Sequence, residues 1–412
     1  MIGRTNASAG GGAPTTGDYL VRYIDIDGTV LKEQWVNSGQ DATPPSNPNY
    51  DSSYLTFSAW SKSSTNITNH KDIGALYTTL NNKSYAFLSL TTASGVSPIL
   101  NLNKTDASTL TIDWGDGNQT THTEVGNFNT SHLYSTTGNY VISMWISSGT
   151  GNYTFGNGTN STMFLVTYKY CLTKLYIGSN VVSLPSYSLY EHQTLEVVLI
   201  PSTLTTLNTY SFASCYKLKA LVFSNNITSI PNYLVSRCYN IINVVFPDSI
   251  SNFGMYAFQY CKILKYVVIP SVSNYTVGAY SFQYCYSLET IHLNNSIRYL
   301  STSALYNCSA FKELIFKSGI NSFQGTNDTL SALNTLDFPT TINEIGTFPN
   351  CFALTKVICR KTTVPLLGSS AFNSQMINPS FKIYVPDASV AAYKAAAGWS
   401  TYATQIYAIS TM

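Results

Sequence analysis

The chain has 412 residues, of which 22 are Lys or Arg and 20 are Asp or Glu, so that charged residues make up 10% and the net charge is +2. Soluble globular proteins carry about 25% charged residues, and so weak a charge without a basic cluster argues against nucleic-acid binding. A hydrophobic fraction of 44% with 13% aromatics argues against disorder, and no apolar run approaches the roughly 20 residues of a membrane span.

The first segment, residues 1–18, is rich in glycine and has no apolar stretch of the kind found in a signal peptide. Nothing that looks like a C-terminal anchor follows Trp399. We therefore expect no export signal, and we interpret residues 1–18 as a tail that docks the protein on a virion or another surface assembly.

Residues 19–80 predict a small β module. Asp27-Gly28 separates two apolar runs, which is a strong signal for a hairpin. A loop with three prolines and then Phe57 and Trp60 follow before a final strand at 73–77. This order resembles the internalin B-repeat, and the resemblance implies a β-grasp-like module of a bacterial surface protein.

Residues 81–166 carry the motif Asp-Trp-Gly-Asp-Gly at 113–117, then His132 and Tyr134, then Gly-Asn-Tyr at 138–140. These motifs are similar to PKD-like, immunoglobulin-type β-sandwiches, which implies a spacer domain. Asp113 and Asp116 could also bind Ca²⁺, but this cation takes six to eight oxygen ligands and no other acid is near in sequence. We favour hydrogen bonds within a turn, with the cation as the alternative.

From residue 167 to 386 the chain repeats itself every 23 or 24 residues, and we count ten units. Each unit starts with a short apolar strand, often closed by proline, and a second apolar pair and a small-aromatic pair follow. A unit of this size cannot bury its apolar face alone, whereas stacked units share a continuous core. The period therefore predicts a solenoid of about ten coils.

The repeated pattern Leu-x-x-Ile-x-Ile-Pro, followed by Ala-Phe-x-x-Cys, resembles the BspA-type leucine-rich repeat of bacterial surface proteins that bind host matrix, mucosal or cell ligands. The stretch 317–332 departs from it, because Gly325 and the three residues after it replace the small-aromatic pair. Residues 387–412 predict a cap, with Asp387 as the N-cap of a helix over 388–397 and Gly398 at its end. The residues expected to cover the end of the core are Trp399, Tyr402 and Ile406.

The cysteines form a column rather than disulfide pairs. Cysteine fills one slot in five consecutive coils, with His192 before this series and Leu330 after it. Five in a row cannot all pair, and a spacing of 23 residues does not match the short Cys-x-x-Cys pairs that hold zinc. We interpret the column as small buried thiols. The series consists of Cys215, Cys238, Cys261, Cys285 and Cys308, and Cys351 takes the slot once more.

The sequence predicts neither an enzyme nor a cofactor. The five histidines are scattered over three modules, and G-x-S-x-G, H-E-x-x-H and P-loop motifs are absent. Glu289, His292 and Glu313 could come close together on the sheet, but a repeat surface brings such residues together by chance.

Two further columns run along the predicted solenoid. A tyrosine ladder with steps of 23 or 24 residues consists of Tyr187, Tyr210, Tyr233, Tyr256 and Tyr280. The other column lies between inward apolar residues, so its side chains should point outward. Either both columns only stabilise the solenoid, or the outward face binds a glycan or protein. The residues that would form this binding face are Tyr266, His292, Glu313, Asn243 and Val268.

The fold predicted from sequence is thus mainly β and multidomain, with a β-grasp-like module, an immunoglobulin-like (PKD-like) sandwich, a leucine-rich-repeat solenoid and a short helical cap. We expect a non-enzymatic adhesin at an extracellular surface, with two β spacers that carry the solenoid. Display on a phage particle is the first expectation, because particles leave a cell by lysis without an export signal. A bacterial BspA-like adhesin is the alternative, followed by a structural virion decoration protein. Homo-oligomerisation stays open.

Overall fold

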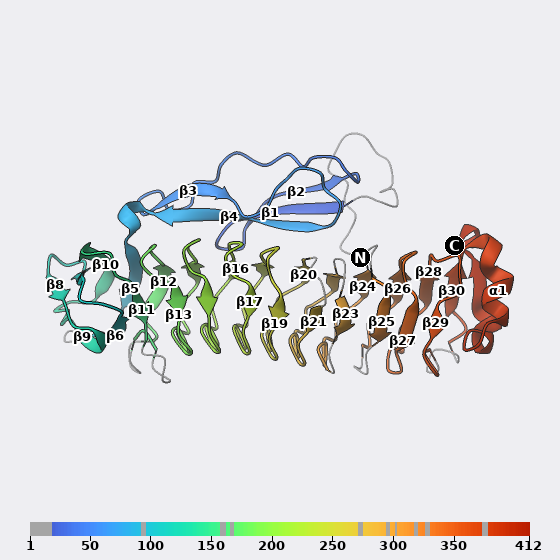
Figure 1. Cartoon of the computed structure of the whole chain (residues 1–412). Coiled ribbons are helices and arrows are strands. Elements are labelled where there is room, and N and C mark those ends of the chain that lie inside the picture. Colours follow the sequence, from blue (N-terminus) through green and yellow to red (C-terminus); the bar gives the residue numbers. More distant parts are fainter. Residues whose placement is uncertain are drawn as a thin grey trace.

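The computed structural model describes residues 19–91, 96–156, 162–164, 169–270, 275–293, 297–300, 303–316, 320–325, 330–372 and 378–412. The predicted docking tail, residues 1–18, and most of the irregular turn expected near residue 327 lie outside this range. The chain forms a long row of coils with a small sheet on one side and a cap at each end (Figure 1).

The coils form a β-solenoid of about nine turns, close to the ten units that the repeat period predicts. Each coil contributes one strand to a parallel sheet that we call the front sheet; for example, Thr290 of one coil is the register partner of Glu313 in the next. The front-sheet strands are β12 (Leu172–Tyr176), β14 (Val197–Leu199), β16 (Ala220–Val222), β18 (Asn243–Val245), β20 (Tyr266–Ile269), β22 (Thr290–Leu293), β24 (Glu313–Phe316), β26 (Thr335–Phe338), β28 (Lys356–Cys359) and β30 (Lys382–Val385).

A second set of short parallel strands lies across the core from the front sheet. Leucine, isoleucine and phenylalanine side chains fill the space between them, and one apolar core runs from Ala86 to Ile406. Stacking thus buries the face that a single coil would leave exposed. These strands are β13 (Ser183–Leu184), β15 (Thr206–Leu207), β17 (Ser229–Ile230), β19 (Asn252–Phe253), β21 (Tyr275–Val277), β23 (Ile297–Leu300), β25 (Ser322–Gly325), β27 (Glu344–Thr347) and β29 (Leu366–Leu367).

The segment predicted as a spacer sandwich closes the first end of the solenoid instead. Its main sheet continues the front sheet in the order β14-β12-β5-β10-β7-β8, and a smaller sheet has the order β11-β6-β9. Since β12 pairs with β5, the spacer expectation is wrong for this segment. Its strands are β5 (Ser84–Leu90), β6 (Ile99–Lys104), β7 (Thr109–Asp113), β8 (Gln119–His122), β9 (Gly126–Ser131), β10 (Gly138–Ser148) and β11 (Tyr153–Phe155).

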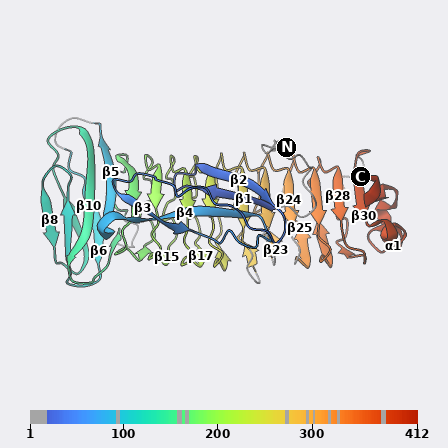
Figure 2. The same ribbon diagram turned by 90° about the horizontal axis from the view of Figure 1, so that it is seen from above.

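The first module is not a spacer either, because it lies flat on the front sheet (Figures 1 and 2). Its four strands form a mixed sheet in the order β2-β1-β4-β3, with β1 and β4 parallel. At Gly74 a methyl group would lie 2.2 Å from Val222 Cγ1, so only glycine allows this close approach. The strands are β1 (Tyr19–Ile24), β2 (Val30–Val36), β3 (Leu55–Trp60) and β4 (Lys71–Thr79), and the 3-10 turn η1 (Leu80–Asn82) leads to β5.

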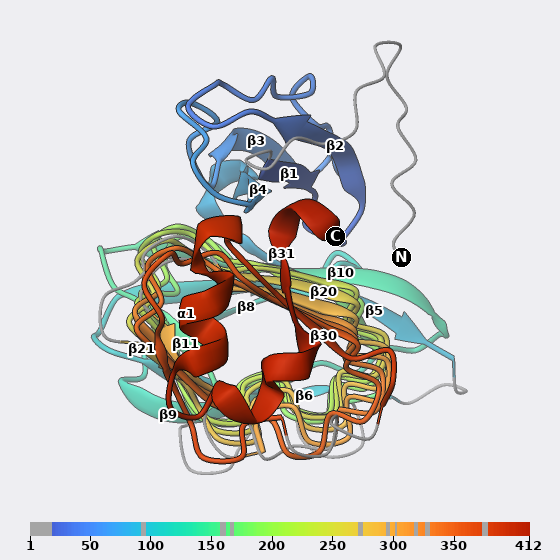
Figure 3. The same cartoon turned by 90° about the vertical axis from the view of Figure 1, so that its right-hand side faces the viewer.

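The C-terminal residues cover the other end of the core (Figure 3). Trp399, Tyr402 and Ile406 are buried there, as predicted. The predicted capping role of Asp387 is wrong, because its carboxylate accepts a hydrogen bond from the backbone N–H of Ser410, and the helix is shorter than expected. The cap consists of η4 (Asp387–Ser389), α1 (Val390–Ala395), η5 (Ser400–Gln405), β31 (Ile406–Ala408), which pairs with β30, and η6 (Ile409–Thr411).

Candidate ligand-binding face of the solenoid

The outer face of the front sheet is built from alternate strand positions. In β26, Leu336 and Phe338 are buried in the coil, whereas Thr335 and Asp337 point away from it. Since every coil repeats this alternation, two columns of side chains run along the whole outer face. The β1–β4 module divides this face into a covered half, β12 to β22, and an open half, β24 to β31.

Apolar contacts hold the module on the covered half. Leu20 of β1 packs against Tyr266 and Val268, and Ile24 packs with Val222 and Val245. The strands of the module run across the coil strands (Figure 2). The apolar outward residues of these coils are therefore buried a second time, under another layer of the same chain.

Four of the five residues predicted to bind a ligand lie beneath this module. The exposed fractions are 7% for Asn243, 6% for Tyr266, 2% for Val268 and 3% for His292. The prediction that these side chains are exposed is wrong. The sequence pattern correctly indicates that they point out of the coil, but it does not show that the β1–β4 module covers them. Glu313, in the open half, is exposed as expected.

A buried polar network fixes the position of the module. Arg22 makes a bidentate ion pair with Asp72, both contacts being 2.7 Å. Its Nη1 donates to Asn243 Oδ1 at 3.3 Å, and the guanidinium lies 4.0 Å from the centre of the Tyr266 ring. Burial opposes the charge of Arg22, but the Asp72 carboxylate outweighs this effect and raises the pKa of Arg22. Asn243 Nδ2 also donates to the carbonyl of Gly28 at 2.8 Å.

Two histidines meet at the far end of the covered half. The His70 ring of the module lies 3.9 Å, centre to centre, from the His292 ring of β22. His70 Nδ1 accepts a hydrogen bond from the backbone N–H of Leu20 at 2.9 Å, so this nitrogen is unprotonated. The suspected grouping of Glu289, His292 and Glu313 is absent, because His292 is buried under His70 and Glu289 pairs with Lys312 at 3.1 Å.

A pocket of about 600 Å³ lies where β1 and β2 meet the coils. Its wall combines apolar side chains with acidic and basic ones, and clefts between packed units are common ligand sites. Ile242 and Ile263 are more than a third exposed there. The lining residues are Leu20, Arg22, Glu33, Ile242, Asn243, Ile263, Lys265, Tyr266 and Glu289.

The open half presents charged and aromatic side chains. Arg360 makes a bidentate pair with Asp337, with contacts of 2.8 and 2.7 Å, and this carboxylate raises the pKa of Arg360. Beyond it lie Lys356 and Lys382, which are register partners in neighbouring coils. Tyr407 of β31 is 40% exposed at the end of the face.

The tyrosine ladder is present as predicted. Successive rings stack with centres 4.5 to 4.8 Å apart and with interplanar angles of 9° or less. Every ladder tyrosine also has a positive φ, from 57° to 64°, a conformation that costs most residues about 1–2 kcal/mol. Each coil turns sharply at this position, and stacking offsets part of the cost. The ladder rings flank the covered half and are only partly buried.

The cysteine column consists of buried thiols that form no disulfides among the described residues, as predicted. In four coils the thiol donates to a carbonyl of the preceding coil over 3.0–3.1 Å, and Cys261 does so over 3.6 Å. This shared hydrogen bond explains why a small donor recurs in the slot. Burial raises the pKa of Cys238, so its thiol is unreactive.

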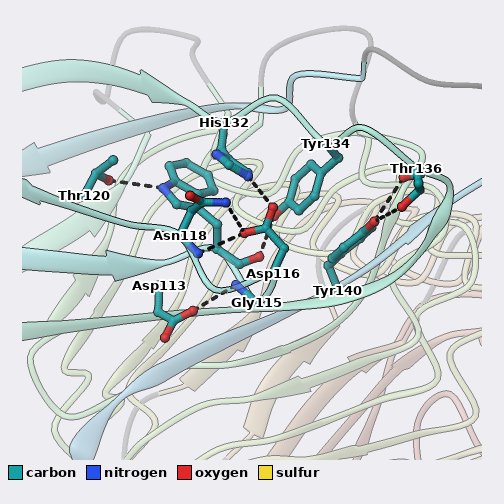
Figure 4. A network of polar contacts seen from close by, with 10 residues as sticks. Asp113, Gly115, Asp116, Asn118, Thr120, His132, Tyr134, Thr136 and Tyr140 are labelled. Atoms are coloured by element: carbon teal, nitrogen blue, oxygen red, sulfur yellow. Dashed lines mark hydrogen bonds and ion pairs between the residues drawn. The ribbon is translucent and has the colours of Figure 1, made fainter.

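Asp113 and Asp116 make hydrogen bonds within the turn after β7 (Figure 4). Asp113 accepts from the backbone N–H of Gly115 at 2.9 Å, and Asp116 lies 2.6 Å from His132 Nε2. The part of the chain that the structure describes contains no group of three His, Cys, Asp or Glu side chains able to hold a metal. The hydrogen bonds expected within this turn are therefore present, and Ca²⁺ binding stays an untested alternative from the sequence.

Sequence reasoning did not identify the residues of the β1–β4 module that dock it on the front sheet. Arg22 and Asp72 form the buried ion pair there, and a charged residue within an apolar strand of a charge-poor chain is a signal that could have pointed to them.

Among the helices in the described ranges, none is both long and apolar enough to cross a membrane.

Comparison with known proteins agrees with the repeat pattern. The model of the "BspA type Leucine rich repeat region" matches six copies at residues 163–276 and 252–378, together just over half of the chain. Similar solved structures include a leucine-rich repeat protein from Bacteroides ovatus (19% identity, 54% of this chain and 68% of that one, TM-score 0.38) and one from T. pallidum (20%, 49% and 83%, 0.37). A leucine rich cell surface protein from Faecalibacterium prausnitzii is also similar (17%, 53% and 79%, 0.28). No curated protein matches the sequence.

Proposed function

The chain belongs to the BspA-type leucine-rich repeat family, and from this premise we propose that it is a non-enzymatic binding protein displayed at a cell surface. Its ligand contacts the open half of the front sheet. In this role the solenoid acts as a rigid support, and the chemistry of binding lies in the outward side chains of successive coils.

The observation that carries this proposal is the division of the outer face. The β1–β4 module buries the outward residues of β18 to β22, whereas Glu313, Thr335 and Lys382 in later coils reach solvent. A surface that the protein already covers with its own chain cannot receive a partner, so within the front sheet the open half is the surface that remains accessible to one.

The ligand class that fits this face is an extracellular glycan or protein. The open half offers hydroxyl, ammonium and aromatic groups on a flat sheet, and these groups suit polar ligands with extended surfaces. Catalysis is not part of the proposal, because the histidine and the acids that might have formed a site are separated or paired.

Blocking the open half with a bulky side chain tests this function. We expect Thr335→Trp to abolish binding of the full-length protein to host cells or to a glycan and matrix-protein array. Thr206→Trp is the matched control, because Thr206 is exposed in β15, outside the front sheet. Equal binding by both variants and the wild type would overturn the proposal.

Placement on a bacterial cell surface follows the family. Attachment to a phage particle through residues 1–18, a purely structural decoration role and homo-oligomerisation stay predictions from the sequence. Co-sedimentation with particles, compared before and after deletion of residues 1–18, tests the phage alternative.

A further inference from the structure

Opposite charges pair between neighbouring coils of this solenoid. In the described residues, three basic side chains each contact an acid of the preceding coil, over 2.7 to 3.1 Å, and the two members of each pair are 23 residues apart. This arrangement follows from the stacking, because residues in register lie about 4.8 Å apart and like charges there repel each other. The pairs are Lys219–Glu196, Lys312–Glu289 and Arg360–Asp337.

Lys356 and Lys382 break this pattern. They are register partners in β28 and β30, so two lysines lie next to each other on the open half. Among the described residues no acid forms an ion pair with either lysine. On the other side of Lys356 the register partner is the neutral Thr335. In a chain with only 22 basic residues, two adjacent lysines without a counter-charge form a local excess of positive charge.

An aromatic surface lies beside the two lysines. Lys382 Nζ is 5.4 Å from the centre of the Tyr407 ring, and this ring is 40% exposed. The ring lies 6.3 Å from that of Tyr384, which is 9% exposed and supports it from the next strand. The ring of Tyr407 is therefore held in place by Tyr384, is partly exposed to solvent, and lies beside the two lysines.

We propose that Lys356, Lys382 and Tyr407 bind an acidic carbohydrate. The two ammonium groups hold its carboxylate or sulfate, and the sugar ring packs against Tyr407. This inference rests on the proposed function and names its ligand class. Two effects favour binding. The anion is attracted to both ammonium groups, and its charge screens the repulsion between the two lysines.

The number of unpaired charges favours this ligand over a polyanion. Arg360, the next basic residue along the face, is already neutralised by Asp337. A nucleic acid is gripped through many phosphate contacts, whereas the lysine pair matches a single anionic group. The exposed ring adds the stacking surface that a simple anion does not need.

Matched oligosaccharides test the proposal on the full-length protein. Three probes share one backbone and carry a carboxylate, a sulfate or only hydroxyl groups, and affinity is measured by calorimetry. We expect the neutral probe to bind about tenfold more weakly than at least one acidic probe. The two acidic arms show which anion is preferred, and equal binding of all three would overturn the inference.

Variants of the lysines give the second arm. Lys356→Thr with Lys382→Thr should lower affinity for the acidic probe about tenfold, whereas the control pair Lys219→Thr and Lys312→Thr, which removes two paired lysines, should not. Lys382→Glu creates an opposite-charge pair with Lys356, like the pairs between the other coils. It should abolish binding without lowering Tm, an outcome that a merely structural role of Lys382 does not predict.

The results separate this inference from the proposed function. If Thr335→Trp abolishes binding but the double lysine variant retains it, the ligand uses the open half and the acidic-sugar site is wrong. If neither changes binding, the open half itself is wrong. Equal affinity for single-stranded DNA would also overturn the inference, since it would show binding to any polyanion.

Discussion

The covered and open halves of the front sheet have the same coil but different outward residues. In the covered half these residues are mainly apolar or neutral, such as Ala220, Val222 and Val245, and all three are buried. In the open half, the charged residues Glu313 and Lys382 occupy the position that Ala220 has in the covered half, and Asp337 occupies the position of Val222. The comparison teaches that the inward-facing apolar residues specify the coil. The outward-facing residues instead differ according to whether the β1–β4 module or solvent covers them.

The turns beside the two halves differ as well. The stacked tyrosines run from Tyr187 to Tyr280, alongside the coils that the module covers. In the following coil Ser303 takes the same left-handed position, with φ of 58°. The coils of the covered half thus share an aromatic column that ends where the open half begins.

The largest expected effect comes from breaking the ion pair beneath the module. Asp72→Asn leaves the guanidinium of Arg22 buried without a counter-charge, and such a loss costs about 3–5 kcal/mol. We expect the module to unfold or leave the sheet. Denaturant unfolding gives the loss of free energy, and hydrogen exchange should show new exposure of β18 and β20.

The matched control is the pair Lys219–Glu196, whose side chains are 46% and 38% exposed, against 9% and 2% for Arg22 and Asp72. Glu196→Gln should change stability by less than about 1 kcal/mol, because solvent screens an exposed pair. Similar effects of the two substitutions would contradict a docking role for the buried pair.

Acid should destabilise the first coils of the solenoid through His192, which is buried in their core. Burial disfavours the charged imidazolium and lowers the pKa of this side chain from its usual 6.5 to about 4. Between pH 6.5 and 4, the unfolded chain therefore binds a proton at His192 that the folded chain does not. The unfolding free energy contributed by neutral His192 is fully present above pH 6.5 and is lost as the pH falls to about 4. The shift corresponds to about 3 kcal/mol.

Leucine offers the matched replacement, because Leu330 fills the same slot in a later coil. In His192→Leu the fall in unfolding free energy between pH 6.5 and 4 should be smaller by about this amount. An unchanged pH profile would show that other groups govern acid sensitivity.

The smallest effect distinguishes backbone strain from stacking in the tyrosine ladder. Tyr233 stacks at 4.5 Å on Tyr210 and at 4.7 Å on Tyr256, with φ of 57°. Tyr233→Ala loses the stacking and keeps the strained φ, whereas Tyr233→Gly loses the stacking and relieves the strain. We expect the Gly variant to be more stable than the Ala variant by about 1 kcal/mol. The reverse order in thermal unfolding would show that the turn carries no strain.

Much of the fold could be predicted from sequence because the interactions within a coil are local. The 23-residue step predicts the coils, the tyrosine ladder and the thiol column, since each depends on contacts between equivalent residues of adjacent coils. The candidate site could not be predicted as well. Tyr266 and His292 are buried by Leu20 and His70, which lie more than 200 residues earlier in the chain, and no periodic signal reports such a contact.

The low charge content belongs to what the sequence alone determined. Stacked coils place identical positions about 4.8 Å apart, so neutral hydroxyl and aromatic residues can repeat where like charges would repel. The tertiary structure alone decided which part of this uncharged face is free. The module docks on the apolar outward residues because their burial is favourable, and it leaves Lys356 and Lys382 uncovered in the open half.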